Sequence, residues 1–282
     1  MLLRDLLASW AGRFSDAGIE SATADAELLF AFITNQRRGQ VQAAELSGAV
    51  VEPEQVLIFN ELALRREARE PLQHLTGVAH FRHITLQVGK GVFVPRPETE
   101  LLAGLAIEFL ETCGERPVVV DLCSGSGAVA LSVAHEVPQS RVFAIEKSPE
   151  AHAWATKNFA NFPNAKLFLG DIADGTIPSL FGRTDAVLTN PPYIPTEMVP
   201  IYPEVALHDP ELALYGGDDG LDVVRIAERA AHELLRVGGL FATEHADTQA
   251  GAITELLLAR GWRNVTSHKD FNGRDRVVSA IR

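Results

Sequence analysis

The sequence predicts an α/β fold in which a doubly wound, Rossmann-like sheet follows a small all-helical region. Two observations support this prediction. From residue 117 onwards, short apolar runs alternate with helical stretches, as in successive βαβ units. Over residues 2–72, apolar residues instead recur at helical spacing. We therefore expect a helical domain joined to a sheet domain, and sheets of this kind bind ligands at the carboxyl ends of their parallel strands.

The elements of the sheet domain follow from the same alternation. The expected strands are residues 118–122, 142–145, 166–169, 186–188 and 240–243, and the expected helices are residues 127–137, 149–160, 221–236 and 247–260. The end of the chain differs, because residues 265–269 and 276–281 flank Asn272 and Gly273. That pattern predicts an antiparallel hairpin that closes the edge of the sheet. The expected sheet is therefore mixed, with seven strands.

The first 95 residues divide in two. Three or four short helices are expected over residues 2–72. Residues 75–94 then alternate in polarity around Gly89, Lys90 and Gly91, which predicts a β-hairpin or a bent pair of strands. We place a helical domain at residues 1–74, a hairpin linker at 75–95 and the sheet domain at 96–282. Pro97 suits the first turn of a helix that extends to about residue 111.

Composition restricts the class of protein. The formal net charge is −12, from 37 acidic and 25 basic residues, and no run of lysine and arginine stands out. Such a surface repels polyanions, so nucleic acid is disfavoured as a partner. The two cysteines form no Cys-x-x-Cys pattern, the nine histidines show no metal-ligand spacing, and no segment resembles a signal peptide or a membrane span. We expect a reduced, cytoplasmic protein that uses neither a metal nor a membrane.

Residues 184–193 combine a buried strand with an abrupt stop. Pro191 and Pro192 cannot donate to a strand ladder, so Asn190 is left at the carboxyl end of the strand, beside the aromatic ring of Tyr193. A planar nitrogen with two hydrogens can donate one to the Asn190 side-chain oxygen and one to the Pro191 carbonyl. The same residues also fit a strand that ends in a proline turn with an Asx-type cap. Residues elsewhere in the chain have to decide between the two.

A second site is predicted after the first strand of the sheet. Gly125 and Gly127 allow the backbone to approach a ligand closely at the start of a helix. Glu146 ends the next strand about twenty residues on, where a carboxylate can bind both hydroxyls of a ribose. Asp171 follows the third strand, where it can accept from an adenine amino group. Asp121, just before the loop, can bind an amino group.

Two classes of cofactor compete for this site. The glycines with Ala130 and Glu146 also fit the fingerprint of a nicotinamide dehydrogenase. Against that class, Asp121 favours an amino group over a pyrophosphate, and Asp171 adds a further acid. The fourth strand also ends in an acceptor corner, where a dehydrogenase would need an acid or base. These features favour S-adenosylmethionine, which has a ribose, an adenine and a charged amino-acid tail but no phosphate.

Taken together, the motifs resemble the HemK/PrmC family of release-factor glutamine N5-methyltransferases. The resemblance rests on residues 121–127 (Asp-x-x-x-Gly-x-Gly), Glu146, 190–193 (Asn-Pro-Pro-Tyr) and 93–100 (Phe-Val-Pro-Arg-Pro-Glu-Thr-Glu), and it extends to residues 71–77, 216–221 and 270–276. The family implies a class I methyltransferase fold and a helical amino-terminal domain. It also implies a methyl transfer from S-adenosylmethionine, which becomes S-adenosylhomocysteine, to the glutamine of the Gly-Gly-Gln loop of peptide chain release factors.

The resemblance also implies roles for individual residues. Asn190, Pro191, Pro192 and Tyr193 are implied to hold the glutamine. The residues implied to line the cofactor are Cys123, Ser124, Gly125, Ser126, Gly127, Glu146, Ile172 and Asn190. Ile172 departs from the larger aromatic residue of some relatives. Cys123 and the serines replace a glycine and a threonine that are frequent in this loop.

Two residues have two readings each, and one long segment has a further expectation. Arg96 lies between two prolines and either contacts the substrate at the rim of the site or has a structural role at a helix start. Residues 194–220 carry four prolines and little regular pattern, and we expect a loop that embraces the substrate. Glu244 ends the fifth strand and either faces the site or caps the next helix. No histidine or carboxylate is obvious at the acceptor corner itself.

Two other functions remain as alternatives at this point. One is methylation of an exocyclic amino group on DNA or RNA, because Asn-Pro-Pro-Tyr is shared with such enzymes. The other is a non-catalytic adaptor that binds the cofactor or the release factor without turnover.

Overall fold

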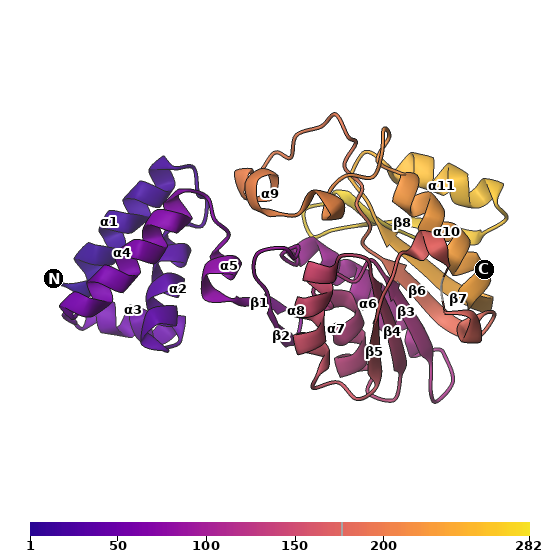
Figure 1. The fold of residues 1–282 in the computed structure, drawn as a ribbon, viewed down its shortest axis with the longest axis horizontal. Helices are drawn as coiled ribbons and strands as arrows, with labels where there is room; N and C mark the ends of the chain where they lie inside the picture. The colour runs from indigo at the N-terminus through magenta and orange to yellow at the C-terminus, as the bar shows by residue number, and fades with distance from the viewer. Residues whose placement is uncertain (176) are drawn as a thin grey trace. The chain divides into compact units, whose positions relative to one another are not determined.

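The computed structural model describes residues 1–175 and 177–282, and these form two compact units (Figure 1). One unit comprises Met1–Gly77 together with Ile201–His208. The other comprises Val78–Pro200 and Asp209–Arg282. A short segment from the second half of the chain therefore packs within the helical unit.

The helical unit has an aromatic core. Trp10 and Phe14 of the first helix pack with Phe30 and Phe59, whose ring centroids lie 6.0 Å apart. Helices are expected here because the buried residues of each segment recur at three- and four-residue spacing. The helices are α1 (Leu3–Asp16), α2 (Ala22–Thr34), α3 (Arg38–Leu46), α4 (Pro53–Glu67), α5 (Leu72–Thr76) and α9 (Pro203–His208).

Two arginines of the helical unit hold α9. The guanidinium of Arg66 pairs with Asp25 at 2.7 Å and with Glu204 at 2.9 Å, and Arg69 pairs with Glu204 at 2.6 Å. Arg66 is buried, so its charge needs such partners. This network explains why α9 belongs to the helical unit. The segment 194–220 is thus not the irregular loop that we expected.

The second unit contains the predicted mixed sheet of seven strands in the order β5-β4-β3-β6-β7-β9-β8. The first five strands in that order are parallel, and β9 is antiparallel to both of its neighbours. The strands are β3 (Val118–Leu122), β4 (Arg141–Glu146), β5 (Ala165–Leu169), β6 (Thr184–Thr189), β7 (Leu235–Glu244), β8 (Arg263–Lys269) and β9 (Asp275–Ile281).

Helices cover both faces of this sheet (Figure 1). Side chains of α6, α7 and α8 form one apolar core with the sheet, and those of α10 and α11 form the other. Burial on both faces explains the apolar runs at residues 118–120 of β3 and 186–188 of β6. The helices are α6 (Glu100–Leu110), α7 (Ala128–Glu136), α8 (Pro149–Phe159), α10 (Asp222–Leu234) and α11 (Ala250–Ala259), with short 3₁₀ turns η1 (Pro97–Thr99), η2 (Ile172–Asp174), η3 (Pro178–Leu180) and η4 (Glu211–Ala213).

The predicted hairpin before residue 95 is present, but its turn was placed wrongly. β1 (Val78–Phe81) pairs with β2 (Ile84–Gln87), so Arg82 and His83 form the turn. Arg82 adopts a φ of +47°, and its guanidinium is fixed by two hydrogen bonds to Glu136 of α7. The anchoring of one side chain here replaces the glycine that such a turn usually needs.

The two nearby glycines serve close packing instead of a hairpin turn. A Cβ on Gly89 would lie 2.5 Å from the ring of Trp154, and one on Gly91 would lie 2.4 Å from the Glu150 carboxylate. Glycine is thus required where α8 approaches this backbone.

Within residues 1–175 and 177–282, no helix has both the length and the apolar character that crossing a membrane requires.

Candidate active site

The predicted site residues gather where the strand order reverses. Leu122, at the end of β3, pairs with Thr189 at the end of β6, and Thr189 pairs in turn with Thr243 of β7. β3 lies between β4 and β6: the chain continues from β3 to β4 and β5 on one side, and then crosses to β6 on the other side. Open α/β sheets form their ligand crevice at this point, outside the carboxyl ends of the strands.

The loop after β3 is closed around the buried carboxyl of Asp121. Its Oδ2 accepts from the Ser124 hydroxyl at 2.8 Å and from the Ala130 amide at 3.3 Å. Burial is the main cause that raises the pKa of Asp121 to about 7. Asp121 therefore holds the loop against the first turn of α7, in addition to any contact with a ligand.

Three positions in the loop have positive φ, and one of them is Gly125, with a φ of +58°. Gly127 has a φ of +92°, and a Cβ there would lie 2.7 Å from the ring of Phe159. Cys123, with a φ of +64°, occupies the left-handed region that favours glycine. Burial raises the pKa of the Cys123 thiol to about 12, so the thiol stays protonated and is a poor nucleophile.

Glu146 connects the second strand to the same loop. Its Oε2 accepts from the Gly125 amide and its Oε1 from the Ser148 amide, both at 2.7 Å. Burial is the largest influence on this carboxyl and raises its pKa, although the backbone amides oppose the change. Each oxygen can accept a further hydrogen bond, which leaves capacity for two hydroxyls of a ligand.

Asp171 and Ile172 follow β5. The carboxylate of Asp171 pairs with Lys147 at 2.7 Å and accepts from the Ala173 amide at 2.9 Å. The hydrogen bond with Lys147 lowers the pKa of Asp171. Ile172 is buried and packs in the core with Phe143 and Ile145. The predicted contacts of these two residues with an adenine stay predictions.

The corner after β6 is held by side chains from distant parts of the chain. The Thr189 hydroxyl donates to the Leu122 carbonyl at 2.8 Å, which fixes β6 to β3. The Asn190 amide nitrogen Nδ2 donates to the hydroxyl of Thr99 at 3.2 Å. The Tyr193 hydroxyl donates to Glu244 at 3.4 Å, and burial raises its pKa above the usual range of a phenol. Because the Asn190 nitrogen contacts Thr99, the Asn190 side-chain oxygen is not the atom that Thr99 holds.

The segment after the corner packs tightly against its backbone. A Cβ on Gly216 would lie 2.5 Å from the Pro192 carbonyl oxygen, and one on Gly220 would lie 2.2 Å from that of Tyr193. Gln249 also donates to the Tyr193 carbonyl at 2.9 Å. Glycines at these positions therefore allow residues 216–220 to support the corner.

The sequence left two readings for Glu244, and its carboxyl lies at the corner. Glu244 is 2% exposed, and its carboxyl lies next to Tyr193 and Thr99 and caps no helix. Burial is the main cause that raises its pKa to about 7. The signal in the sequence was its position at the end of β7. Glu244 is 51 residues from Tyr193, so a local motif could not connect the two.

Arg96 has a fixed ionic partner. Its Nη2 lies 2.7 Å from Oδ2 of Asp209, and its guanidinium carbon lies 5.1 Å from the centre of the Phe93 ring. Burial raises the pKa of Asp209 to about 6, although Arg96 opposes this. This pair joins the segment before α6 to the segment before η4. A contact between Arg96 and a substrate stays a prediction.

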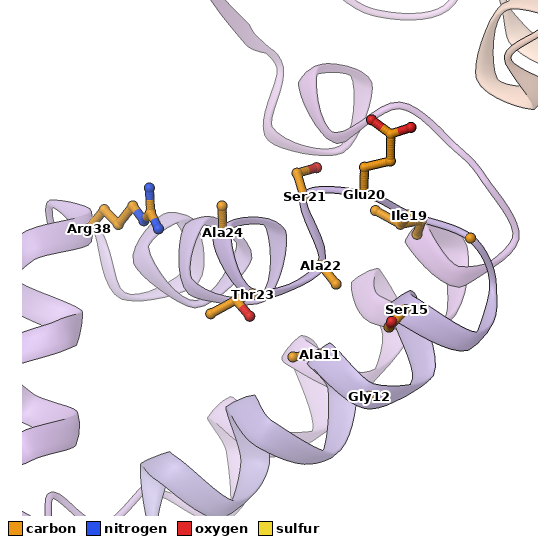
Figure 2. Close-up of a pocket in the computed structure, with 11 residues that line it drawn as sticks. Ala11, Gly12, Ser15, Ile19, Glu20, Ser21, Ala22, Thr23, Ala24 and Arg38 are labelled. Carbon is orange, nitrogen blue, oxygen red and sulfur yellow. The ribbon is translucent and has the colours of Figure 1, made fainter.

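A hollow of about 770 Å³ lies within the helical unit, between the end of α1 and the start of α2 (Figure 2). It is lined mostly by small residues, and its one lining guanidinium, that of Arg38, pairs with Glu27. The hollow thus has no arrangement of groups that suits methyl transfer.

Two family models match the chain. Residues 5–77 match the PrmC N-terminal domain, and residues 87–199 match the methyltransferase small domain. A solved structure of a release factor-specific protein-(glutamine-N5) methyltransferase from Alicyclobacillus acidocaldarius is 27% identical, with a TM-score of 0.42 over 70% of this chain and 98% of that chain.

Relatives cover nearly the whole sequence. The release factor glutamine methyltransferase of Streptomyces coelicolor is 47% identical over 95% of this chain and 94% of its own length. That of Bifidobacterium longum is 41% identical over the full length of both. A 4-amino-L-phenylalanine/4-methylamino-L-phenylalanine methyltransferase of Streptomyces pristinaespiralis is 38% identical over 96% of this chain and 92% of its own. From these matches, the chain belongs to the release factor glutamine methyltransferase family.

Proposed function

We propose that the corner after β6 binds a glutamine side chain of a peptide chain release factor, and that this chain methylates its N5 nitrogen with S-adenosylmethionine. The observation that carries the proposal is the orientation of Asn190, whose Nδ2 donates to Thr99. Its Oδ1 is therefore available as an acceptor, beside the carbonyl of Pro191. Two acceptors at one rigid corner suit a nitrogen with two hydrogens.

The residues around the first loop fit S-adenosylmethionine. Residues 121–128 contain no lysine or arginine that would pair with a phosphate. Glu146 has acceptor capacity left for the ribose hydroxyls. A Cβ on Gly125 would meet nothing within 4 Å, so this backbone is open to a ligand. When bound, this cofactor supplies an electrophilic methyl group.

The residues of the corner have a definite task in the reaction. An amide nitrogen is a poor nucleophile because its lone pair is delocalised into the carbonyl. Asn190 and the Pro191 carbonyl accept its two hydrogens and favour a nitrogen that loses planarity as the new N–C bond forms, an interaction that is stronger in the transition state. They also orient the lone pair, so that proximity contributes to the rate. The nitrogen then releases one proton.

The charge of the protein supports a protein substrate over nucleic acid. Binding to DNA or RNA depends on lysine and arginine contacts with phosphates. This chain has a net charge of −12 and no basic run. The helical unit is proposed to recognise the release factor, a role that stays a prediction.

Incubation with S-adenosylmethionine and four candidate acceptors tests the proposal. The acceptors are a purified release factor, duplex DNA, RNA and 4-amino-L-phenylalanine, which represents the activity named for the relative from Streptomyces pristinaespiralis. We expect the release factor alone to gain one methyl group, about 14 Da, at the glutamine of its Gly-Gly-Gln loop. A release factor with that glutamine replaced is the control and should gain none. Methylation of another acceptor and none of the release factor would overturn the proposal.

A further inference from the structure

The side-chain amide of Asn190 must face one way to act as an acceptor. Its two ends are similar in size, and rotation by 180° would exchange the oxygen for the NH₂ group. The rotated amide would present hydrogens to a glutamine nitrogen that itself has only hydrogens to offer. Some contact must therefore fix the orientation.

Thr99 is placed to provide that contact. It precedes α6 at the N-cap position, where a threonine usually accepts from a backbone amide of the helix, yet its side chain makes no such cap. Its hydroxyl is instead the partner of Asn190 Nδ2, at 3.2 Å. Thr99 is 3% exposed, so water does not compete for the hydroxyl.

The carboxyl of Glu244 lies at the same corner, where the Tyr193 hydroxyl donates to its Oε1 at 3.4 Å. A threonine hydroxyl has one hydrogen to donate. Oε2 of Glu244 is buried without a hydrogen-bond partner and can accept this hydrogen, and the Thr99 hydroxyl is among the groups that oppose the rise in the pKa of Glu244 caused by burial. Of the charged groups around Glu244, Arg276 also lowers its pKa and Glu98 raises it. If the hydrogen points to the carboxylate, the Thr99 oxygen can only accept from Asn190.

We propose that Thr99 and Glu244 are positioning residues that hold the Asn190 amide with its oxygen toward the acceptor nitrogen. This inference rests on the proposed function, because it gives the corner a task only if that nitrogen binds there. It also assigns a task to Thr99 within the Pro-Arg-Pro-Glu-Thr-Glu segment. Tyr193, which donates to the same carboxylate, is held by the same network.

Replacement of Thr99 tests the inference. Thr99→Val removes the hydroxyl and keeps the shape, and Thr99→Ser keeps the hydroxyl. At pH 8.5, where Glu244 is mostly ionised, we expect the valine variant to lose about tenfold in kcat, the typical effect of one buried hydrogen bond. KM for the release factor and the affinity for S-adenosylmethionine should change less than about threefold, and the serine variant should recover most of the turnover. Thr112→Val, which removes an exposed hydroxyl near the end of α6, is the matched control.

A double mutant separates a positioning role from a structural one. If Thr99 acts through Asn190, then Thr99→Val should cost nothing further in an Asn190→Ala background. Glu244→Gln can present an NH₂ group to Thr99, so it should also lower kcat in the wild-type background only. Equal losses in both backgrounds, or an unchanged kcat in Thr99→Val, would overturn the inference. Wild-type protein that fails to methylate the release factor would instead overturn the proposed function.

Discussion

The loop after β3 and the corner after β6 lie at adjacent strand ends, but they are built differently. In the loop, Asp121 is held by Ser124 and Ala130, and Glu146 by Gly125 and Ser148, so most partners are backbone amides near in sequence. In the corner, Asn190 is held by a side chain 91 residues away, and Tyr193 by one 51 residues away. The contrast indicates that the proposed cofactor site depends on local backbone shape, whereas the proposed acceptor site depends on the tertiary fold.

The largest expected effect comes from removing the side chain of Asn190, the proposed hydrogen-bond acceptor at the corner. Asn190→Ala should lower turnover about 10²- to 10³-fold, the typical cost of losing one preorganised polar partner at a reacting centre. Affinity for the cofactor should fall much less, because the loop after β3 is intact. Steady-state kinetics and calorimetry on the same preparation measure both. Near-normal turnover would show that the corner after β6 is not the site at which the acceptor nitrogen is held.

A steric clash at the backbone of the loop should destabilise the fold more than an added methyl group that meets no neighbour. Gly127→Ala places a Cβ 2.7 Å from the Phe159 ring at a φ of +92°, so we expect a loss of about 2–4 kcal/mol in the free energy of unfolding. Gly125→Ala is the control. Its φ is +58° with nothing within 4 Å of the added carbon, and it should cost only about 1 kcal/mol. Urea denaturation compares the two, and equal losses would contradict the packing argument.

The same contrast explains what the sequence could predict. The sheet, its antiparallel end and the helical region follow from apolar patterns, and all are present in the structure. The loop after β3 was recognisable because its glycines and acids are close in sequence. Thr99 and Glu244 could not be connected to Asn190, because only the packing of α6 and β7 against β6 brings them together. The misplaced hairpin turn has a similar origin, since Arg82 is fixed by the distant Glu136.

A smaller effect is expected from the carboxylate that joins β4 to the loop. Glu146→Ala should weaken S-adenosylmethionine binding by about 1.5–3 kcal/mol, the range for hydrogen bonds to a charged group. The rate at saturating cofactor should change less, because the ribose does not react. Glu146→Gln keeps an acceptor for the Gly125 amide. Its affinity for S-adenosylmethionine should therefore lie between those of Glu146→Ala and the wild type. Titration calorimetry that finds unchanged affinity in the alanine variant would remove Glu146 from the cofactor site.

The smallest effect concerns Asp171, at the edge of the same site. Asn keeps the acceptor for the Ala173 amide but loses the charge, so Asp171→Asn should weaken cofactor binding by about 1 kcal/mol if the carboxylate accepts from the adenine amino group. The ion pair with Lys147 complicates this test. Lys147 is exposed, and such pairs contribute only about 0–1 kcal/mol, so Lys147→Met should change the affinity little. Should calorimetry give equal losses for the two variants, Asp171 would act on the cofactor only through Lys147, and its assignment to the adenine would be wrong.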